Sequence, residues 1–264
     1  MYTEAGNGVK GVFLGLAAGD RIGGPTRMAL ELAESLTERN ALDLRDVARR
    51  YMNWWRKDGF DTGPTATRVF ELASSGLAIE QAVIKVDIES GGQTAGCNPA
   101  HRSAPLAMAA FIADGQLGEA AAAEALLTHR HPLAGDVAAA VVVLCRALIR
   151  GVPWLRALEV AAAGRRPETR QALAVGYAAG LSPGGYAPDV LRAAVFILHH
   201  SHSFNAALRR AVDFAGPSNY CPVLVGCLGG AKWGRSSIPD SVMPARPVLM
   251  KRINKAADAL AAGW

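Results

Sequence analysis

Two acidic residues have neighbours that suit acid–base chemistry, and the first is Asp61. It lies in the segment Phe60–Thr65, directly before an apolar stripe that predicts a helix from Ala66. A carboxylate held beside a pocket in this way can serve as a general base. The alternative is that Asp61 or Thr62 only caps the helix, because both residue types accept hydrogen bonds from first-turn N–H groups.

The second acid, Asp20, follows a run of small residues. Gly11, Gly15 and Gly19 recur at four-residue spacing, which predicts a helix packed closely against a neighbour. The run looks superficially like a dinucleotide-binding fingerprint, but no predicted strand precedes it. Asp20 falls where the helix ends, so it is either a turn residue or a second candidate for catalysis.

A glycine-rich stretch, residues 89–106, is the longest segment without helical periodicity. Long irregular segments are uncommon in compact domains and are often functional, although a plain surface connection is the alternative. Backbone N–H groups of such a loop can bind a phosphate, and Arg102 could assist.

Histidines occur in two groups. His129 and His131 precede Asp136 at no recognised metal-ligand spacing, so they are weak evidence for a metal. The group at residues 199–202 falls at a predicted helix end, where imidazoles commonly cap carbonyl groups.

The elements that must position these side chains are predicted to be helices. Few segments alternate with period two, and glycine, proline and asparagine separate the apolar stripes. The sequence predicts an all-α fold, one orthogonal bundle of about ten or more helices forming a single domain over residues 1–264. Apolar residues recur at three- and four-residue spacing in segments 28–36, 66–72, 107–112, 121–127, 137–149, 154–163, 169–179, 190–199, 204–214, 223–233 and 248–262.

Composition excludes several classes of protein. The 264 residues are 50% hydrophobic and 19% charged, and the net charge of +5 comes without a run of five positive residues. We therefore expect no nucleic-acid surface. The most apolar stretch, residues 137–149, is predicted to be too short to cross a bilayer. Four separated cysteines and no signal-like beginning favour reduced thiols in a cytoplasmic protein.

Taken in order, the motifs resemble the ADP-ribosylglycohydrolase family over about residues 8–264. Gly15–Asp20 resembles the family's opening glycine-rich helix, and Phe60–Gly63 resembles the segment that carries a catalytic aspartate. Gly96–Pro105 resembles the loop that holds ADP-ribose, and Thr128 with His129 matches a Thr-His pair near the same ligand. Residues 203–239 resemble the C-terminal metal segment.

The departures from the family concern its metal site. Where the family's first metal motif has two aspartates and a threonine, this chain has Gly24, Pro25 and Thr26. The Asp-x-Asp-Thr/Ser of the C-terminal segment is replaced by Pro217–Tyr220. Because Mg²⁺ and Mn²⁺ need several oxygen ligands, usually including carboxylates, we expect no metal cofactor.

The resemblance implies a substrate site, with Asn219 and Tyr220 filling the space of the lost ions. Asp61 is the expected catalytic residue, with Asp20 second. The expected substrate-binding residues are Thr62, Gly63, Thr94, Ala95, Gly96, Cys97, Asn98, Arg102, His129, Asn219 and Tyr220.

Two functions follow from the resemblance. The first is a metal-independent N-glycoside hydrolase for an ADP-ribose-like or ribosyl-nucleotide small molecule, in which Asp61 activates water or opens the ribose, and Arg102 or a histidine supplies positive charge. The second is a catalytically inactive member that binds a nucleotide or a protein partner. Retention of Asp61 favours the first.

Overall fold

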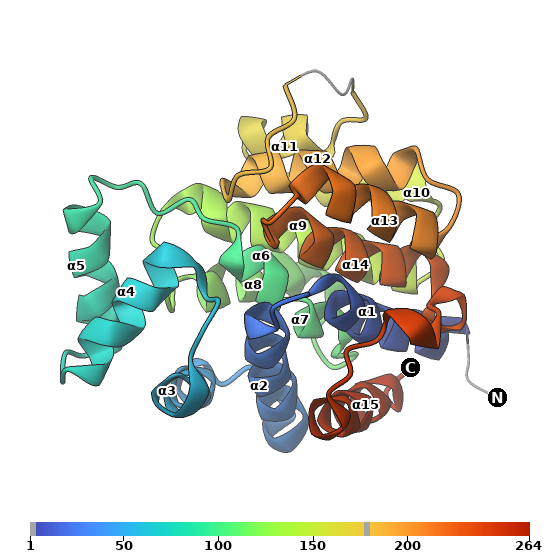
Figure 1. Cartoon of the computed structure of the whole chain (residues 1–264). Helices are drawn as coiled ribbons and strands as arrows, with labels where there is room; N and C mark the ends of the chain where they lie inside the picture. The colour runs from blue at the N-terminus through green and yellow to red at the C-terminus, as the bar shows by residue number, and fades with distance from the viewer. Residues whose placement is uncertain (1–3, 177–179) are drawn as a thin grey trace.

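The computed structural model describes residues 4–176 and 180–264, and all regular structure in these residues is helical. The all-α prediction is confirmed. Figure 1 shows the helices crossing at many angles, with α4 and α5 extending to one side. The helices are α1 (Glu4–Gly19), α2 (Gly24–Arg39), α3 (Leu44–Asp58), α4 (Gly63–Ser74), α5 (Ile79–Glu89), α6 (Asn98–Arg102), α7 (Pro105–Met108), α8 (Leu117–Ala125), α9 (Pro132–Ile149), α10 (Trp154–Ala162), α11 (Pro167–Leu173), α12 (Ala187–His199), α13 (Phe204–Ala215), α14 (Tyr220–Trp233) and α15 (Pro247–Ala261).

Helices α1 and α14 pack without side chains between their backbones. A Cβ atom on Gly15 would lie 2.2 Å from the carbonyl oxygen of Gly226, and one on Gly11 would lie 2.1 Å from that of Gly230. The close helix packing predicted from the glycine spacing is therefore confirmed. The pair is antiparallel, because Gly19 at the end of α1 faces Pro222 at the start of α14. This arrangement brings the residues after α1 beside those before α14.

Helix α9 runs through the core. It has 18 residues, so it is longer than its apolar stretch suggested, and by length and composition it could cross a membrane. The expectation that it is too short is therefore wrong. In the structure 78% of its residues are buried within the protein, as in a core helix.

Four segments differ from the predicted helices. The helix expected over 107–112 stops at Met108, because the buried guanidinium of Arg146 takes the carbonyl groups of Ala107, Ala109 and Ile112. Helices α3 and α5, which are rich in charge or largely exposed, were not predicted. The helix expected over 169–179 ends at Leu173, and its residues 177–179 lie outside the described residues.

Candidate functional site

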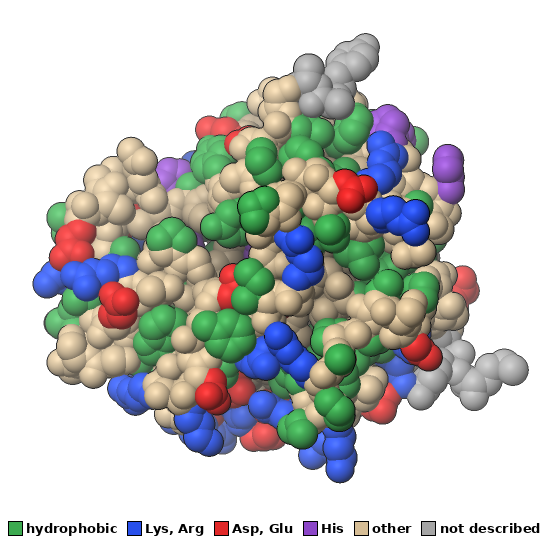
Figure 2. All heavy atoms as spheres, in the orientation of Figure 1, with side chains coloured by type: hydrophobic (Ala, Val, Ile, Leu, Met, Phe, Trp, Pro, Cys, Tyr) green, Lys and Arg blue, Asp and Glu red, His purple; other side chains and the backbone are tan. Residues whose placement is uncertain are grey.

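A cavity of about 720 Å³ opens where the start of α4, the loop before α6 and the start of α14 meet. Figure 2 shows a hollow in the surface between the α4–α5 side and the rest of the molecule. The volume suits a ligand of small-molecule size. No Lys or Arg side chain lines this cavity among residues 4–176 and 180–264. Figure 2 shows many of these side chains along the lower edge, over α2, α3 and α15, and others scattered over the rest of the face.

Asp61 stands at the cavity wall in a strained conformation. Its φ of 52° lies in the left-handed region, which non-glycine residues seldom adopt. Asp61 lies in the connection between α3 and α4, which Phe60 holds in place. The Phe60 ring packs against Trp54 and lies under the guanidinium of Arg27. Thr62 is the N-cap of α4, but its side chain makes no capping hydrogen bond. The Asp61 carboxylate accepts instead from Asn219, so the capping alternative is wrong for both residues.

The surroundings of Asp61 favour its protonated form. Partial burial, and then the nearby carboxylate of Asp20, raise the pKa of Asp61 to about 6. Hydrogen bonds from Asn219 and from the backbone of Gly24 oppose that rise. A carboxylate with this pKa is ionised at neutral pH and is still basic enough to accept a proton.

Asp20 lies beside Asp61 but behind the wall. Its Oδ1 accepts from the Gly23 N–H at 2.7 Å and from Asn219 Nδ2 at 2.8 Å, and its Oδ2 accepts from the Thr26 N–H at 2.8 Å. The residue is 3% exposed and does not line the cavity. Asp20 therefore holds the start of α2, and its predicted role as a catalytic alternative does not fit the structure.

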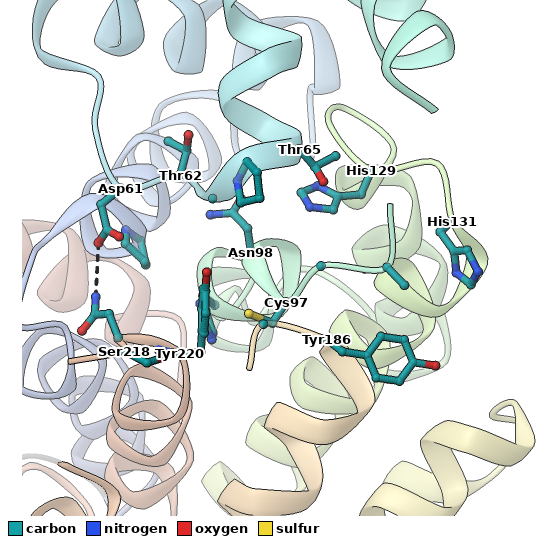
Figure 3. Close-up of a pocket in the computed structure, with 18 of the residues that line it drawn as sticks. Asp61, Thr62, Thr65, Cys97, Asn98, His129, His131, Tyr186, Ser218 and Tyr220 are labelled. Atoms are coloured by element: carbon teal, nitrogen blue, oxygen red, sulfur yellow. Dashed lines mark hydrogen bonds between the residues drawn. The ribbon is translucent and has the colours of Figure 1, made fainter. Parts of the chain in front are cut away.

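The amide of Asn219 joins the two carboxylates. Its Nδ2 donates to Asp20 at 2.8 Å and to Asp61 at 3.2 Å, the bond drawn dashed in Figure 3. Its Oδ1 accepts from the Arg21 N–H at 3.2 Å. Flipping the amide would direct its oxygen toward both carboxylates, so these three partners determine its orientation.

The residues do not fit the divalent metals of the family. An N–H₂ donor occupies the space between the two carboxylates, and a Cβ on Gly24 would lie 2.4 Å from the carbonyl oxygen of Asp61. An acid side chain therefore has no room at that position. Thr26 keeps a buried hydroxyl oxygen that has no hydrogen-bond partner among the described residues, but one hydroxyl is a poor site for Mg²⁺. No cluster of three His, Cys, Asp or Glu side chains forms in the described parts of the chain.

Tyr220 lines the cavity, as expected from the sequence. Its ring stacks on that of His101, with centroids 6.5 Å apart, and the backbone of Gly185 covers part of it. In Figure 3 its hydroxyl points into the space between Asp61 and Asn98. Burial raises the pKa of Tyr220, so the hydroxyl stays protonated at neutral pH.

Of the predicted site residues in the glycine-rich stretch, four line the cavity and two, Thr94 and Arg102, lie behind it. Ala95, Gly96, Cys97 and Asn98 line the cavity, as do Thr62 and Gly63. Burial raises the pKa of the Cys97 thiol, so this residue is no thiolate nucleophile.

Thr94 does not reach the cavity, contrary to the prediction. Its hydroxyl donates to Asp87 at 2.7 Å and accepts from the His131 N–H at 3.0 Å. It therefore ties the loop to α5 and to the start of α9.

Arg102 also lies away from the cavity, so its predicted phosphate contact is wrong. Its side chain is fully buried and pairs with Glu124, which is itself fully buried, at 2.7 Å. The same guanidinium donates to Asn98 Oδ1 at 2.6 Å and to Thr128 Oγ1 at 2.7 Å. Its positive charge is compensated within the core.

His129 lines the cavity opposite Asp61. Its Nδ1 is 2.8 Å from Thr128 Oγ1, and its Nε2 lies beside Gly96. Burial and the charge of Arg102 hold the pKa of His129 well below its usual value. The imidazole is therefore neutral at physiological pH.

Several cavity residues were missed from the sequence. Tyr186 and Gly185 reach the site because the Cys97 N–H donates to Gly185 and the Ala187 N–H donates to Ala95. No sequence signal predicts a pairing between segments about ninety residues apart. The other missed lining residues are Ile22, Pro25, Pro64, Thr65, Gly92, Gln93, His101, His131, Pro217 and Ser218.

Comparison with known structures places the whole chain in one class of α-helical protein. A solved structure described as an ADP-ribosylglycohydrolase-related protein complex superposes with a TM-score of 0.78 and 25% identity, covering 98% of each chain. The family model described as ADP-ribosylglycohydrolase matches residues 25–264. The chain belongs to the ADP-ribosylglycohydrolase family, a family of hydrolases.

A relative with a stated activity shares the same region. The ADP-ribosyl-[dinitrogen reductase] glycohydrolase of Rhodospirillum rubrum is 25% identical over 238 residues, which cover 90% of this chain and 78% of that protein.

Proposed function

We propose that this protein is a metal-independent N-glycoside hydrolase that acts on an ADP-ribose-like or ribosyl-nucleotide substrate. Its family and its relative in Rhodospirillum rubrum support hydrolysis of ADP-ribosyl groups. The observation that carries the proposal is Asp61, a strained carboxylate at the wall of the cavity with its pKa raised to about 6. Strain and a pKa near neutrality are costs that a purely structural acid has no need to bear.

In the proposed reaction Asp61 acts on water. Its carboxylate accepts a proton from a water molecule whose oxygen attacks the anomeric carbon of the ribose. The bond from that carbon to the aglycone nitrogen breaks, and the nitrogen keeps the electron pair. A cationic nitrogen, as in NAD⁺, thereby becomes neutral, whereas an uncharged nitrogen takes up the proton that Asp61 removed from the water. Asn219 holds the carboxylate in place from the side of the core.

Without a metal ion, another group must supply the positive charge. Among the described residues no Lys or Arg side chain lines the cavity, and the charge of Arg102 is compensated by Glu124 in the core. We propose that two neutral hydrogen-bond donors take over this electrostatic role. They are the Tyr220 hydroxyl and the Asn98 amide, which line the same cavity as Asp61. Hydrogen-bond donors fixed in a site from which water is excluded stabilise negative charge that develops during reaction.

Turnover and binding measured on the same samples test the proposal. The purified protein is incubated with N-glycosides of ADP-ribose and of ribose 5-phosphate, NAD⁺ among them, with and without EDTA, and released aglycone is followed by chromatography. ADP-ribose binding is measured by calorimetry. We expect turnover that EDTA leaves unchanged and that Asp61→Asn abolishes while ADP-ribose still binds. Binding without turnover of any N-glycoside would contradict the proposal and indicate an inactive family member.

A further inference from the structure

We propose that Arg102 is a positioning residue that fixes His129 as the neutral tautomer protonated on Nε2 and aims the amide N–H₂ of Asn98 into the cavity. Both effects arise from one buried network. As a result the site offers two hydrogen-bond donors to an acceptor oxygen of the substrate. Arg102 itself touches no substrate.

The network begins at a charge pair in the core. Glu124 Oε1 accepts from Arg102 Nε at 2.7 Å and from the Tyr51 hydroxyl at 2.8 Å, and the Glu124 carbonyl accepts from Arg102 Nη2 at 3.2 Å. The guanidinium also stands over the Tyr51 ring, 5.2 Å from its centroid. All three side chains are fully buried, so the guanidinium has a single orientation.

The orientation of the guanidinium directs the hydroxyl of Thr128. Arg102 Nη1 can only donate, so Thr128 Oγ1 accepts that bond at 2.7 Å. The Thr128 hydroxyl then has one proton to place, and His129 Nδ1 lies 2.8 Å away. If Nδ1 carried the proton instead, the Thr128 O–H would be buried without an acceptor within the described residues. A buried donor without an acceptor is costly, so Nδ1 is the acceptor.

This hydrogen bond determines whether the His129 nitrogen that faces the cavity, Nε2, is a donor or an acceptor. A neutral imidazole that accepts at Nδ1 carries its proton on Nε2. A Cβ built on Gly96 would lie 3.0 Å from Nε2, so the glycine leaves this nitrogen open to the cavity. His129 is 3% exposed, and its Nε2 has no hydrogen-bond partner in the described residues.

The same guanidinium orients Asn98. Its Nη1 donates to Asn98 Oδ1 at 2.6 Å, so the amide oxygen faces the core and the amide nitrogen faces the opposite way. Figure 3 shows this nitrogen pointing into the cavity, and among the described residues it donates to a weak acceptor, Met28 Sδ, at 3.8 Å. Two donors thus face the cavity, His129 on the side opposite Asp61 and Asn98 between the two. Ribose hydroxyl and phosphate oxygens are acceptors that fit them.

Nuclear magnetic resonance of ¹⁵N-histidine-labelled protein tests the tautomer without any substrate. The His129 signals are assigned as those that disappear in His129→Gln. We expect an unprotonated Nδ1 and a protonated Nε2 at neutral pH. Protonation on Nδ1, or on both nitrogens, would overturn the inference.

Binding of ADP-ribose to matched variants tests the positioning role. Thr128→Val removes the hydroxyl at nearly constant volume, whereas Thr128→Ser keeps it. We expect about tenfold weaker ADP-ribose binding for the valine variant and wild-type binding for the serine variant. Arg102→Lys keeps the charge but loses the planar fork, so we expect a loss of at least that size. If Arg102→Lys does not fold, the Thr128 pair decides alone.

Adenosine diphosphate locates the acceptor oxygen. An equal loss for this ligand in Thr128→Val assigns the acceptor to the ADP part, and a loss for ADP-ribose alone assigns it to the second ribose. Unchanged ADP-ribose affinity in the valine variant would contradict the positioning role.

The choice of ADP-ribose rests on the proposed function, whereas the protonation of His129 does not. Wild-type protein that neither binds ADP-ribose nor turns over any of the N-glycosides would therefore contradict the proposed function, and a wrongly protonated His129 would contradict only the inference about Arg102.

Discussion

The turn between α1 and α2 and the connection between α3 and α4 each bring one carboxylate to the amide of Asn219, yet the two acids have opposite environments. Asp20 accepts two backbone N–H groups and the amide, and it is 3% exposed. Asp61 faces the cavity and accepts from the Asn219 amide and from the backbone of Gly24. Burial together with a third N–H donor separates the carboxylate that holds the fold from the one available for chemistry.

The energetic difference follows from these contacts. The raised pKa of Asp61 means that the folded protein binds this proton more tightly than the unfolded chain does. The ionised carboxylate therefore costs stability, and this cost grows as the pH rises from about 4 through about 6. The φ of 52° adds strain at the same residue.

Asp61→Asn is expected to have the largest effect. An amide of the same size cannot accept a proton at neutral pH, so kcat should fall by about 10²–10⁴-fold. The variant should also be more stable at pH 7, by about 1 kcal/mol after screening by solvent, because an ionised group next to Asp20 is removed. Turnover and thermal unfolding of the same sample check both effects. Wild-type turnover on the true substrate would remove Asp61 from the mechanism.

Asp20→Asn should show the reverse pattern. An asparagine can offer one oxygen where Asp20 offers two, so its N–H₂ would face either the Gly23 or the Thr26 N–H. We expect a loss of about 1–3 kcal/mol in unfolding free energy. The measurement is urea unfolding, with Asp213→Asn on the exposed face of α13 as a control of equal charge change. Unchanged stability combined with lost turnover would reverse the roles of the two acids.

Asn219→Asp would convert the shared amide into a third carboxylate. The two bonds from Nδ2 are lost and three acids repel one another, so we expect a loss of about 1–2 kcal/mol at pH 8 and a smaller loss at pH 5. Melting temperatures at both pH values check this. A variant that is more stable at pH 8 would show that Nδ2 does not lie between two carboxylates.

The pH dependence of turnover should report Asp61. Because the base must be ionised, kcat should fall about tenfold for each pH unit below about 6 and level off above it. A profile measured from pH 4.5 to 8 checks this, with melting curves to exclude unfolding. If kcat fell as the pH rose instead, the group required for turnover would be a protonated acid rather than an ionised base.

Removal of divalent metal ions with EDTA should leave turnover unchanged. With an amide between the carboxylates and no room for a side chain at Gly24, we expect no stoichiometric divalent metal and equal turnover with or without EDTA. Elemental analysis of the purified protein checks the first point. One or two Mg²⁺ or Mn²⁺ ions per chain would show that both carboxylates are metal ligands.

The sequence alone determined most of the helices and the packing of one pair. Apolar residues at helical spacing predict α9, α10 and α12–α15 within a few residues, because burial of one face is a local, periodic requirement. The spacing of Gly11, Gly15 and Gly19 predicts close approach of a second helix, although it does not say that the partner is α14. The position of Asp61 before α4 is likewise visible in the sequence.

The tertiary structure alone decided what the polar residues do. Arg102 and Asp20 have the residue types of a phosphate ligand and a catalytic acid, but their partners Glu124 and Asn219 lie 22 and 199 residues away. Tyr186 reaches the cavity through a backbone pairing with no sequence signature. A charge or hydrogen-bond donor acts on whatever lies within a few ångströms, and this distance depends on how the helices pack rather than on the residue type. The side chains free to meet a substrate are therefore those that the packed core leaves without partners.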